Sequence, residues 1–180
     1  MDERLAERGP RSGRPGDRGV PEARTHLVKS WYQRYLGQEA GNGEEQGWVG
    51  LLLAGETEEQ VQAGILGSSE FQSRAQTLIS SGSSDQRYVW ALYLVLLNRT
   101  ASDAEVSGWV GALPTAGHNG VAQGFLGSNE FRTEMTTAFY STFLHRDSDA
   151  AGLNGWVWSG LDLKHVREGF EGSGEFFADG

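Results

Sequence analysis

Three segments of the chain repeat hydrophobic residues with the periodicity of an α-helix. In the first, Val28, Trp31, Tyr32 and Tyr35 follow the spacing i, i+3, i+4, i+7 and so share one helix face. The same offsets recur in two later sets, which are Val89, Leu92, Tyr93 and Leu96, and then Thr136, Phe139, Tyr140 and Phe143. Such a face could line a ligand groove, but it is more often buried in a core. We therefore predict an all-α protein, a compact array of about ten helices without strands.

Each aromatic stripe opens a longer pattern that occurs three times. A tyrosine is followed after sixteen residues by the tryptophan of a Gly-Trp pair, and later by Gly-Ser-x-Glu-Phe. The matching positions are Tyr32, Trp48, Ser68, Glu70 and Phe71; Tyr93, Trp109, Ser128, Glu130 and Phe131; and Tyr140, Trp156, Ser173, Glu175 and Phe176. This recurrence predicts three degenerate helical repeats, which we place at residues 26–86 (copy one), 87–133 (copy two) and 134–180 (copy three).

The Gly-Ser-x-Glu-Phe motif has a structural explanation. We expect its glycine to end one helix in a left-handed turn and its serine to cap the next helix. The glutamate then lies in a first turn, where the helix dipole favours negative charge, and the phenylalanine enters the core. Catalysis by Glu70, Glu130 and Glu175 is the alternative, but their equivalence across the copies favours the structural role.

Other helix starts and connections can be predicted from capping residues. Three pairs have the spacing of a capping box, in which a serine, threonine or asparagine is followed three positions later by Glu or Gln. They are Asn42 with Glu45, Thr57 with Gln60, and Ser102 with Glu105. Asp149 is expected to cap a further helix. Residues 80–85 form a polar loop, after which Ser84 or Asp85 opens the next helix. No break separates Phe131 from Tyr140, so one helix of about four turns is expected there.

The charge distribution restricts the partners. Residues 1–24 hold six arginines against five acidic residues, and the rest of the chain holds nine basic against nineteen acidic residues. We interpret residues 1–25 as a flexible arm rich in Arg, Pro and Gly. It lacks the hydrophobic centre of a secretory signal peptide, and no run approaches the length of a membrane span. The acidic remainder argues against nucleic acid as a partner, because phosphate binding requires positive charge.

The sequence offers little for catalysis or cofactors. It has no cysteine, which excludes thiolate chemistry and disulfides. The four histidines, His26, His118, His145 and His165, form no pair at i+3 or i+4 that could bind a metal. Asp147 and Asp149 could begin a calcium loop, but the later ligands are missing and capping by Asp149 explains the same residues. We therefore expect no catalytic residues, no cofactor and no enzyme activity.

Two arginines occupy equivalent positions after the first helix of copies two and three. Arg99 and Arg146 each follow the leucine four residues after the tyrosine by two positions. We hypothesise that each holds the helix-to-helix turn by pairing with a Glu or Asp of its repeat, because a guanidinium can bind a carboxylate through two parallel hydrogen bonds.

Copy three resembles a bacterial family, domain of unknown function 4214. The resemblance is carried by Phe139-Tyr140, Leu144-His145-Arg146, Asp149, Gly152-Leu153, Trp156 and the final Ser-x-Glu-Phe. Across the three copies it covers about residues 26–177. In copy two, residues 96–105 are also similar to the phycobilisome linker polypeptide domain. The resemblance implies an all-helical fold within large surface or secreted proteins, and no established activity.

Several functions follow as expectations. The first is a non-catalytic structural module that scaffolds contacts between proteins, including copies of itself, in a bacterial surface or extracellular assembly; a cytoplasmic location is the alternative. The second is binding of carbohydrate, such as surface glycan, through exposed rings of Trp31, Trp90 or Trp158, with a weak calcium site at Asp147 and Asp149. An enzyme would require a cluster of unrelated polar residues in one cleft, which repeat positions do not supply.

Overall fold

A computed structural model describes residues 19–178, and within this range the chain is all-α, as predicted, with no strand. Its elements in chain order are α1 (Gly19–Trp31), the π-helical turn η2 (Tyr32–Leu36), α2 (Glu45–Ala54), α3 (Glu58–Gly67), α4 (Ser69–Leu78), α5 (Ser84–Leu97), α6 (Asp103–Leu126), α7 (Asn129–Leu144), α8 (Ala150–Val157), α9 (Leu163–Glu171) and α10 (Gly174–Ala178). None of the helices in this range has the length and hydrophobicity needed to cross a bilayer.

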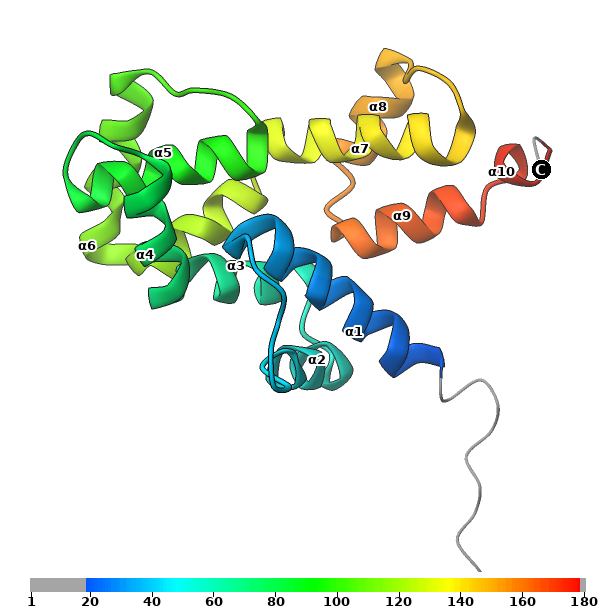
Figure 1. The fold of residues 1–180 in the computed structure, drawn as a ribbon. Helices are drawn as coiled ribbons and strands as arrows, with labels where there is room; N and C mark the ends of the chain where they lie inside the picture. Colours follow the sequence, from blue (N-terminus) through cyan, green and yellow to red (C-terminus); the bar gives the residue numbers. More distant parts are fainter. Residues whose placement is uncertain (1–18, 179–180) are drawn as a thin grey trace, which may run out of the picture.

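The helices form a body around α3, α5 and α6, from which α7 runs outward to α8, α9 and α10 (Figure 1). Helices α3 and α6 pack very closely, since a Cβ added to Gly67 would lie 2.8 Å from Cα of Asn119. Helix α7 has 16 residues, so the predicted continuous helix between Phe131 and Tyr140 is confirmed. It contains the last helix of copy two and the first helix of copy three.

The predicted aromatic stripes form the core. All eight stripe residues of copies one and two are buried, and Thr136, Phe139 and Tyr140 of copy three are buried as well. The largest fully buried side chains include Tyr35, Phe71, Tyr88, Phe125, Phe131 and Phe170. Burial of such side chains contributes about 1.5–3 kcal/mol each to folding.

Most predicted caps are confirmed. Thr57 and Ser102 form capping boxes with Gln60 and Glu105, and Asp149 accepts a hydrogen bond from the Gly152 amide. The motif serines Ser68, Ser128 and Ser173 each accept the amide of the phenylalanine three residues later, at 3.2 Å.

Two local predictions were wrong. Asn42 is not a cap, because its own backbone is left-handed (φ 53°) within a turn, and Glu44 precedes α2 instead. The start of α5 agrees with the prediction, because Ser84 is its first residue, and Ser83 with Gln86 forms the capping box. The second error concerns the motif glycines. Gly127 and Gly172 have right-handed backbones, near φ −87° and −88°, and the extended Ser128 makes the turn after Gly127.

Helix α1 begins at Gly19, so residues 19–25 of the segment interpreted as an arm are helical; the rest of that segment lies outside the described residues.

Contact between the first and last parts of the fold comes from α3 and α9. Arg167 of α9 forms two hydrogen bonds with Glu58, at 2.7 and 3.2 Å, and Glu59 accepts the Leu163 amide at 2.6 Å.

Candidate functional site

The repeated tyrosines and tryptophans meet in pairs. Trp48 Nε1 donates to the Tyr32 hydroxyl at 2.9 Å, and Trp109 Nε1 donates to the Tyr93 hydroxyl at 3.2 Å. In the third copy Tyr140 and Trp156 both pack against Phe170, with ring centroids 4.8 and 5.2 Å away. The fixed spacing of sixteen residues therefore joins a first helix to the helix that carries the tryptophan.

A glycine of the following helix lies against each of these rings. A Cβ at Gly64, Gly124 or Gly169 would approach the Trp48, Trp109 or Trp156 ring to 2.5, 2.8 or 2.5 Å, respectively. These distances are shorter than a carbon–carbon contact allows, so only glycine lets the ring close over the helix backbone. This explains the glycine that opens Gly-x-Leu-Gly-Ser in copies one and two and its counterpart in copy three.

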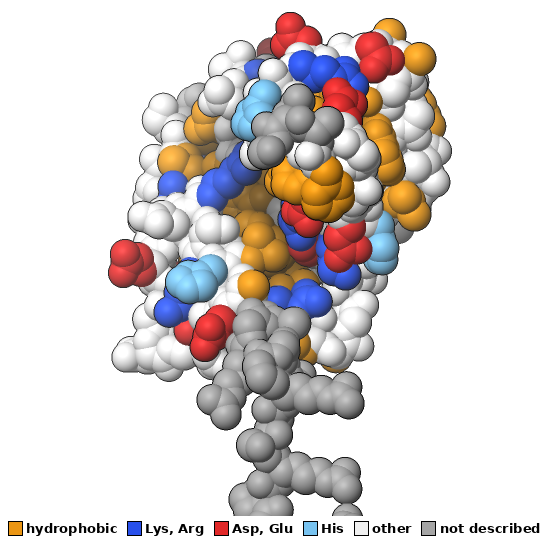
Figure 2. Space-filling model, turned by 90° about the vertical axis from the view of Figure 1, so that its right-hand side faces the viewer, with side chains coloured by type: hydrophobic (Ala, Val, Ile, Leu, Met, Phe, Trp, Pro, Cys, Tyr) orange, Lys and Arg blue, Asp and Glu red, His pale blue; other side chains and the backbone are white. Residues whose placement is uncertain are grey.

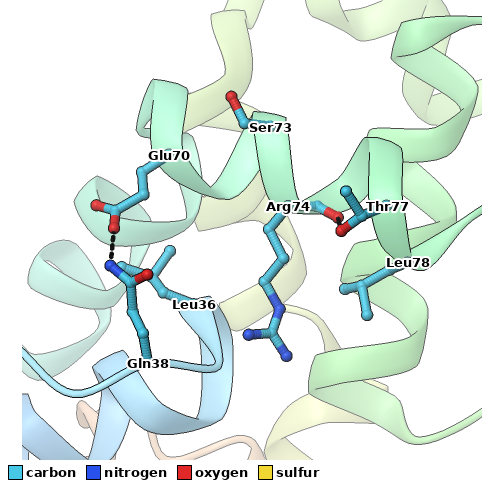
Figure 3. Close-up of a pocket in the computed structure, with 7 residues that line it drawn as sticks. All are labelled: Leu36, Gln38, Glu70, Ser73, Arg74, Thr77 and Leu78. Atoms are coloured by element: carbon cyan, nitrogen blue, oxygen red, sulfur yellow. Dashed lines mark hydrogen bonds between the residues drawn. The ribbon is translucent and has the colours of Figure 1, made fainter.

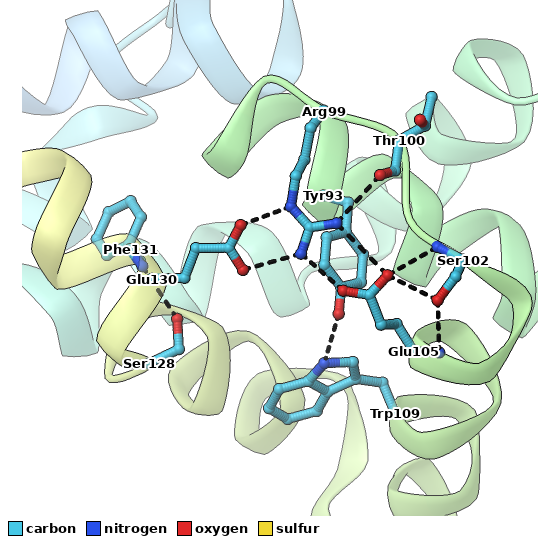
Figure 4. Close-up of polar contacts among 9 residues, drawn as sticks. All are labelled: Tyr93, Arg99, Thr100, Ser102, Glu105, Trp109, Ser128, Glu130 and Phe131. Atoms are coloured by element: carbon cyan, nitrogen blue, oxygen red, sulfur yellow. Dashed lines mark hydrogen bonds and ion pairs between the residues drawn. The ribbon is translucent and has the colours of Figure 1, made fainter.

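Arg99 joins three elements of copy two (Figure 4). Its Nε and one terminal nitrogen donate to the two carboxylate oxygens of Glu130, at 2.5 and 2.8 Å, and it also reaches Glu105 at 2.7 Å. A further donor binds the Thr100 carbonyl oxygen at 3.1 Å. The guanidinium carbon lies 4.6 Å from the centroid of the Tyr93 ring. The turn after α5 is thus tied to the first turns of α6 and α7.

Copy three repeats this arrangement. Arg146 binds both carboxylate oxygens of Glu175, lies 3.6 Å from Asp149, and sits 4.9 Å from the centroid of Tyr140. The hypothesis that Arg99 and Arg146 pair with acidic residues of their repeats is confirmed. In copy one Gln38 takes the place of the arginine, and its amide donates to Glu70.

The ion pairs set the protonation of the carboxylates. Hydrogen bonds from Arg99 lower the pKa of Glu105 to about 2, and those from Arg146 lower the pKa of Glu175. General acid–base catalysis near neutral pH requires carboxyl groups with raised pKa values. Glu175, the motif glutamate of copy three, has the opposite environment, which favours a structural role for it.

Asp147 and Asp149, the two candidate calcium ligands, have structural roles. Asp149 caps α8, and its hydrogen bond from the Gly152 amide lowers its pKa. Asp147 offers its backbone carbonyl oxygen to Arg146 at 3.1 Å. Within residues 19–178 no group of three or more His, Asp or Glu side chains is arranged to hold a metal ion.

The three tryptophans proposed as sugar platforms differ in exposure. Trp31 is only 6% exposed, so its assignment as a platform was wrong, because its stripe faces the core. Trp90 is half-buried, and a Cβ at Gly82 would come within 2.5 Å of its ring. Trp158 is 68% exposed at the end of α8.

Each helix that carries a repeated tryptophan has an exposed stretch without charged side chains. We call α2, the first part of α6 (residues 103–116) and α8 the Trp helices. Residues 46–55, 106–117 and 150–161 contain no Asp, Glu, Lys or Arg. The glycine of each Gly-Trp pair, Gly47, Gly108 or Gly155, faces outward with nothing within 4 Å of its added Cβ. The charge-free stretches are visible in the sequence, but only the structure shows that they are exposed.

Sequence reasoning also missed a depression in copy one. It has a volume of about 410 Å³ and is lined by Arg74, Leu36, Gln38, Thr77 and Leu78 among others (Figure 3). The residues come from the end of η2, the turn that follows it, and α4. Nothing in the local sequence of α4 indicated that Arg74 would turn back toward this turn.

These features define a class of all-helical proteins with repeated Tyr–Trp and Arg–Glu contacts. Residues 74–135 match the family described as Domain of unknown function (DUF4214), which supports the resemblance to this family that the sequence shows. The matched region runs from α4 into α7 and is shorter than the residues 26–177 assigned from the sequence. The predicted similarity to phycobilisome linker domains is not shown by the comparisons. No curated protein and no solved structure matches the chain.

Proposed function

We propose that the chain is a non-catalytic interaction module whose outer faces on the Trp helices contact other proteins. The observation that carries this proposal is the recurrent outward glycine of the Gly-Trp pair. Gly47, Gly108 and Gly155 lie inside helices, with ordinary helical backbones and no neighbouring atoms that would meet a Cβ.

An exposed glycine inside a helix costs about 0.5–1 kcal/mol relative to alanine. The fold gains no packing in return at these three positions, in contrast to Gly64, Gly124 and Gly169. Recurrence in all three copies therefore favours a reason outside the chain, which is the close approach of another backbone or side chain.

The absence of charge supports the same proposal. Protein interfaces are depleted of charged residues at their centres, and the exposed parts of the Trp helices instead present Leu51, Leu53 and Trp158. The pairing of Glu130 and Glu175 with arginines supports the non-catalytic part of the proposal. A bacterial surface or extracellular location remains a prediction from the family resemblance.

The test uses the cysteine-free background of the chain. A photo-cross-linker is placed on a single cysteine at Ser107, next to Gly108, and on a control cysteine at Gln123, which is also exposed on α6. Cross-linking in the native cell lysate and with purified chain is then compared. We expect a discrete product at Ser107 only, either with a second protein or with a second copy. No discrete product, or the same products at both positions, would contradict the proposal.

A matched substitution separates binding from folding. Gly108→Ala adds one methyl group into open space and should raise thermal stability, while it weakens the cross-linked complex. Gly108→Glu should weaken the complex further, because it buries a charge. A complex that tolerates both variants would show that the outward glycine is not at the interface.

Carbohydrate binding is a second candidate, favoured by the exposure of Trp158 alone among the three proposed tryptophans. Stacking on a sugar would change the fluorescence of Trp158. Titration of the full chain with cell-wall glycan, with Trp158→Phe as control, tests this function.

A further inference from the structure

Arg74 differs from the arginines that hold the fold together. Arg99, Arg146 and Arg167 each meet a carboxylate of the chain, as described above. Among residues 19–178, no carboxylate oxygen lies within 4.0 Å of the Arg74 guanidinium. Its Nε is buried and has no hydrogen-bond partner. Within the described residues the charge of Arg74 is thus left without a counter-ion, and the side of the guanidinium that lines the depression can bind an acceptor from outside the chain.

The turn after η2 holds the Arg74 side chain in place. Gly37 has a left-handed backbone (φ 68°), and a Cβ added to it would overlap the Arg74 guanidinium. The missing side chain of Gly37 thus makes room for the guanidinium, which points into the depression between Gln38 and Leu78 (Figure 3). The charged group is therefore partly ordered by the fold before any ligand arrives.

The same position differs between copies. Arg74 stands four residues after the motif glutamate Glu70, and the equivalent residue in copy two is Glu134. Copy one has Gln38 where copy two has Arg99. Copy two thus carries its positive charge in the turn, at Arg99, where carboxylates of the chain neutralise it. Copy one carries it on α4 instead, at Arg74, where no carboxylate of the described residues pairs with it.

We propose that this depression is a binding site for a carboxylate group, with Arg74 as its principal ligand. A guanidinium presents two parallel donors that match the two oxygens of a carboxylate. Leu36 and Leu78 offer apolar contact to the chain behind the carboxylate. Glu70 also lines the depression, and its negative charge favours a singly charged anion over a phosphate dianion. The residues that line this depression are not on the Trp helices, so the proposal is independent of the proposed function.

The test follows the Nε–H resonance of Arg74 in ¹⁵N-labelled full chain. Sodium acetate, N-acetyl-leucine and inorganic phosphate are titrated separately at constant ionic strength, with sodium chloride as reference. We expect saturable shifts with both carboxylates, tighter binding of N-acetyl-leucine than of acetate, and weaker binding of phosphate. The backbone amides of Ser73 and Thr77 should shift in parallel.

Variants assign the effect to Arg74. Arg74→Gln should abolish the saturable shifts of the amides, and Arg74→Lys, which keeps the charge and loses the fork, should weaken binding severalfold. Arg87→Gln is the matched control, because Arg87 donates to the Gly82 carbonyl oxygen outside the depression. The proposal is overturned if chloride shifts the resonances as much as the carboxylates do, or if Arg74→Gln leaves the shifts unchanged. It also fails if Glu70→Gln moves the Arg74 resonance while the carboxylates do not, since Arg74 would then pair with Glu70 in solution.

Discussion

The contact between Gly124 and Trp109 provides a quantitative test of the packing. In Gly124→Ala the new Cβ would lie 2.8 and 2.9 Å from two atoms of the Trp109 ring. The ring cannot move away freely, because it stacks on Phe125 at a centroid distance of 4.5 Å and donates to the Tyr93 hydroxyl. Overpacking of this kind costs about 1–3 kcal/mol. Alanine also gains about 0.5–1 kcal/mol in helix propensity, so the net loss is about 1 kcal/mol.

Gly111→Ala is the matched control, in the segment of α6 that precedes the kink at Gly117. An added Cβ at Gly111 meets nothing within 4 Å, so this variant should gain the propensity term alone. The difference between the two variants therefore isolates the overpacking cost, about 2 kcal/mol. For a chain of this size, that difference corresponds to about 4–8 °C in Tm.

The assay is thermal unfolding followed by circular dichroism, with urea titration to compare m-values. Gly124→Ala should melt below the parent and Gly111→Ala slightly above it, with unchanged m-values. If both variants changed Tm in the same direction and by the same amount, the Trp109 ring would not be confined by the helix, and the explanation of the repeated glycine would be refuted.

Three other substitutions test the polar contacts, and two tryptophan substitutions test the exposure of those rings. Arg146→Ala should lower Tm by less than Gly124→Ala, because the ion pair with Glu175 is largely exposed; an unchanged melting curve would contradict the pairing. Ser102→Ala removes a capping box and should lower the unfolding free energy by about 1 kcal/mol, measured by urea titration. The lowered pKa of Glu105, about 2 against an ordinary 4.5, stabilises the fold above pH 4.5, and this contribution is lost as the pH falls toward 2. Glu105→Gln should therefore flatten the dependence of Tm on pH in this range. Trp158→Phe should remove most of the fluorescence that acrylamide quenches, whereas Trp31→Phe should not.

Local sequence patterns predicted much of the fold. The aromatic stripes identified the buried faces around Tyr32, Tyr93 and Tyr140 because hydrophobic periodicity reports directly which side of a helix is buried. The caps at Thr57, Ser102 and Asp149 followed from interactions that span three residues. Asn42 failed because capping and left-handed turn conformations favour the same residue types, and only the path of the chain selects between them.

The candidate sites show where sequence reasoning stopped. The arginine pairs could be proposed from the recurrence of Arg99 and Arg146, but their partners Glu130 and Glu175 lie some thirty positions away along the chain. Arg74 gave no such signal, since its surroundings are built by η2 and the turn after it. The exposure of Trp158 and the burial of Trp31 likewise depend on neighbours that are distant in sequence.

The sequence by itself determined the helical class, the aromatic faces that become the core, and the recurrence of the Tyr, Trp and Ser-x-Glu-Phe positions. These properties depend on spacing along one helix or across one turn, where geometry is nearly constant. Only the tertiary structure decided that a tryptophan ring packs directly against Gly64 and another against Gly124, whereas Gly108 faces open solvent. It also decided which arginines find a carboxylate, and it placed Arg74, which finds none among the described residues, beside a depression. Both outcomes depend on how far apart the helices pack, because that distance is set by all the side chains between them.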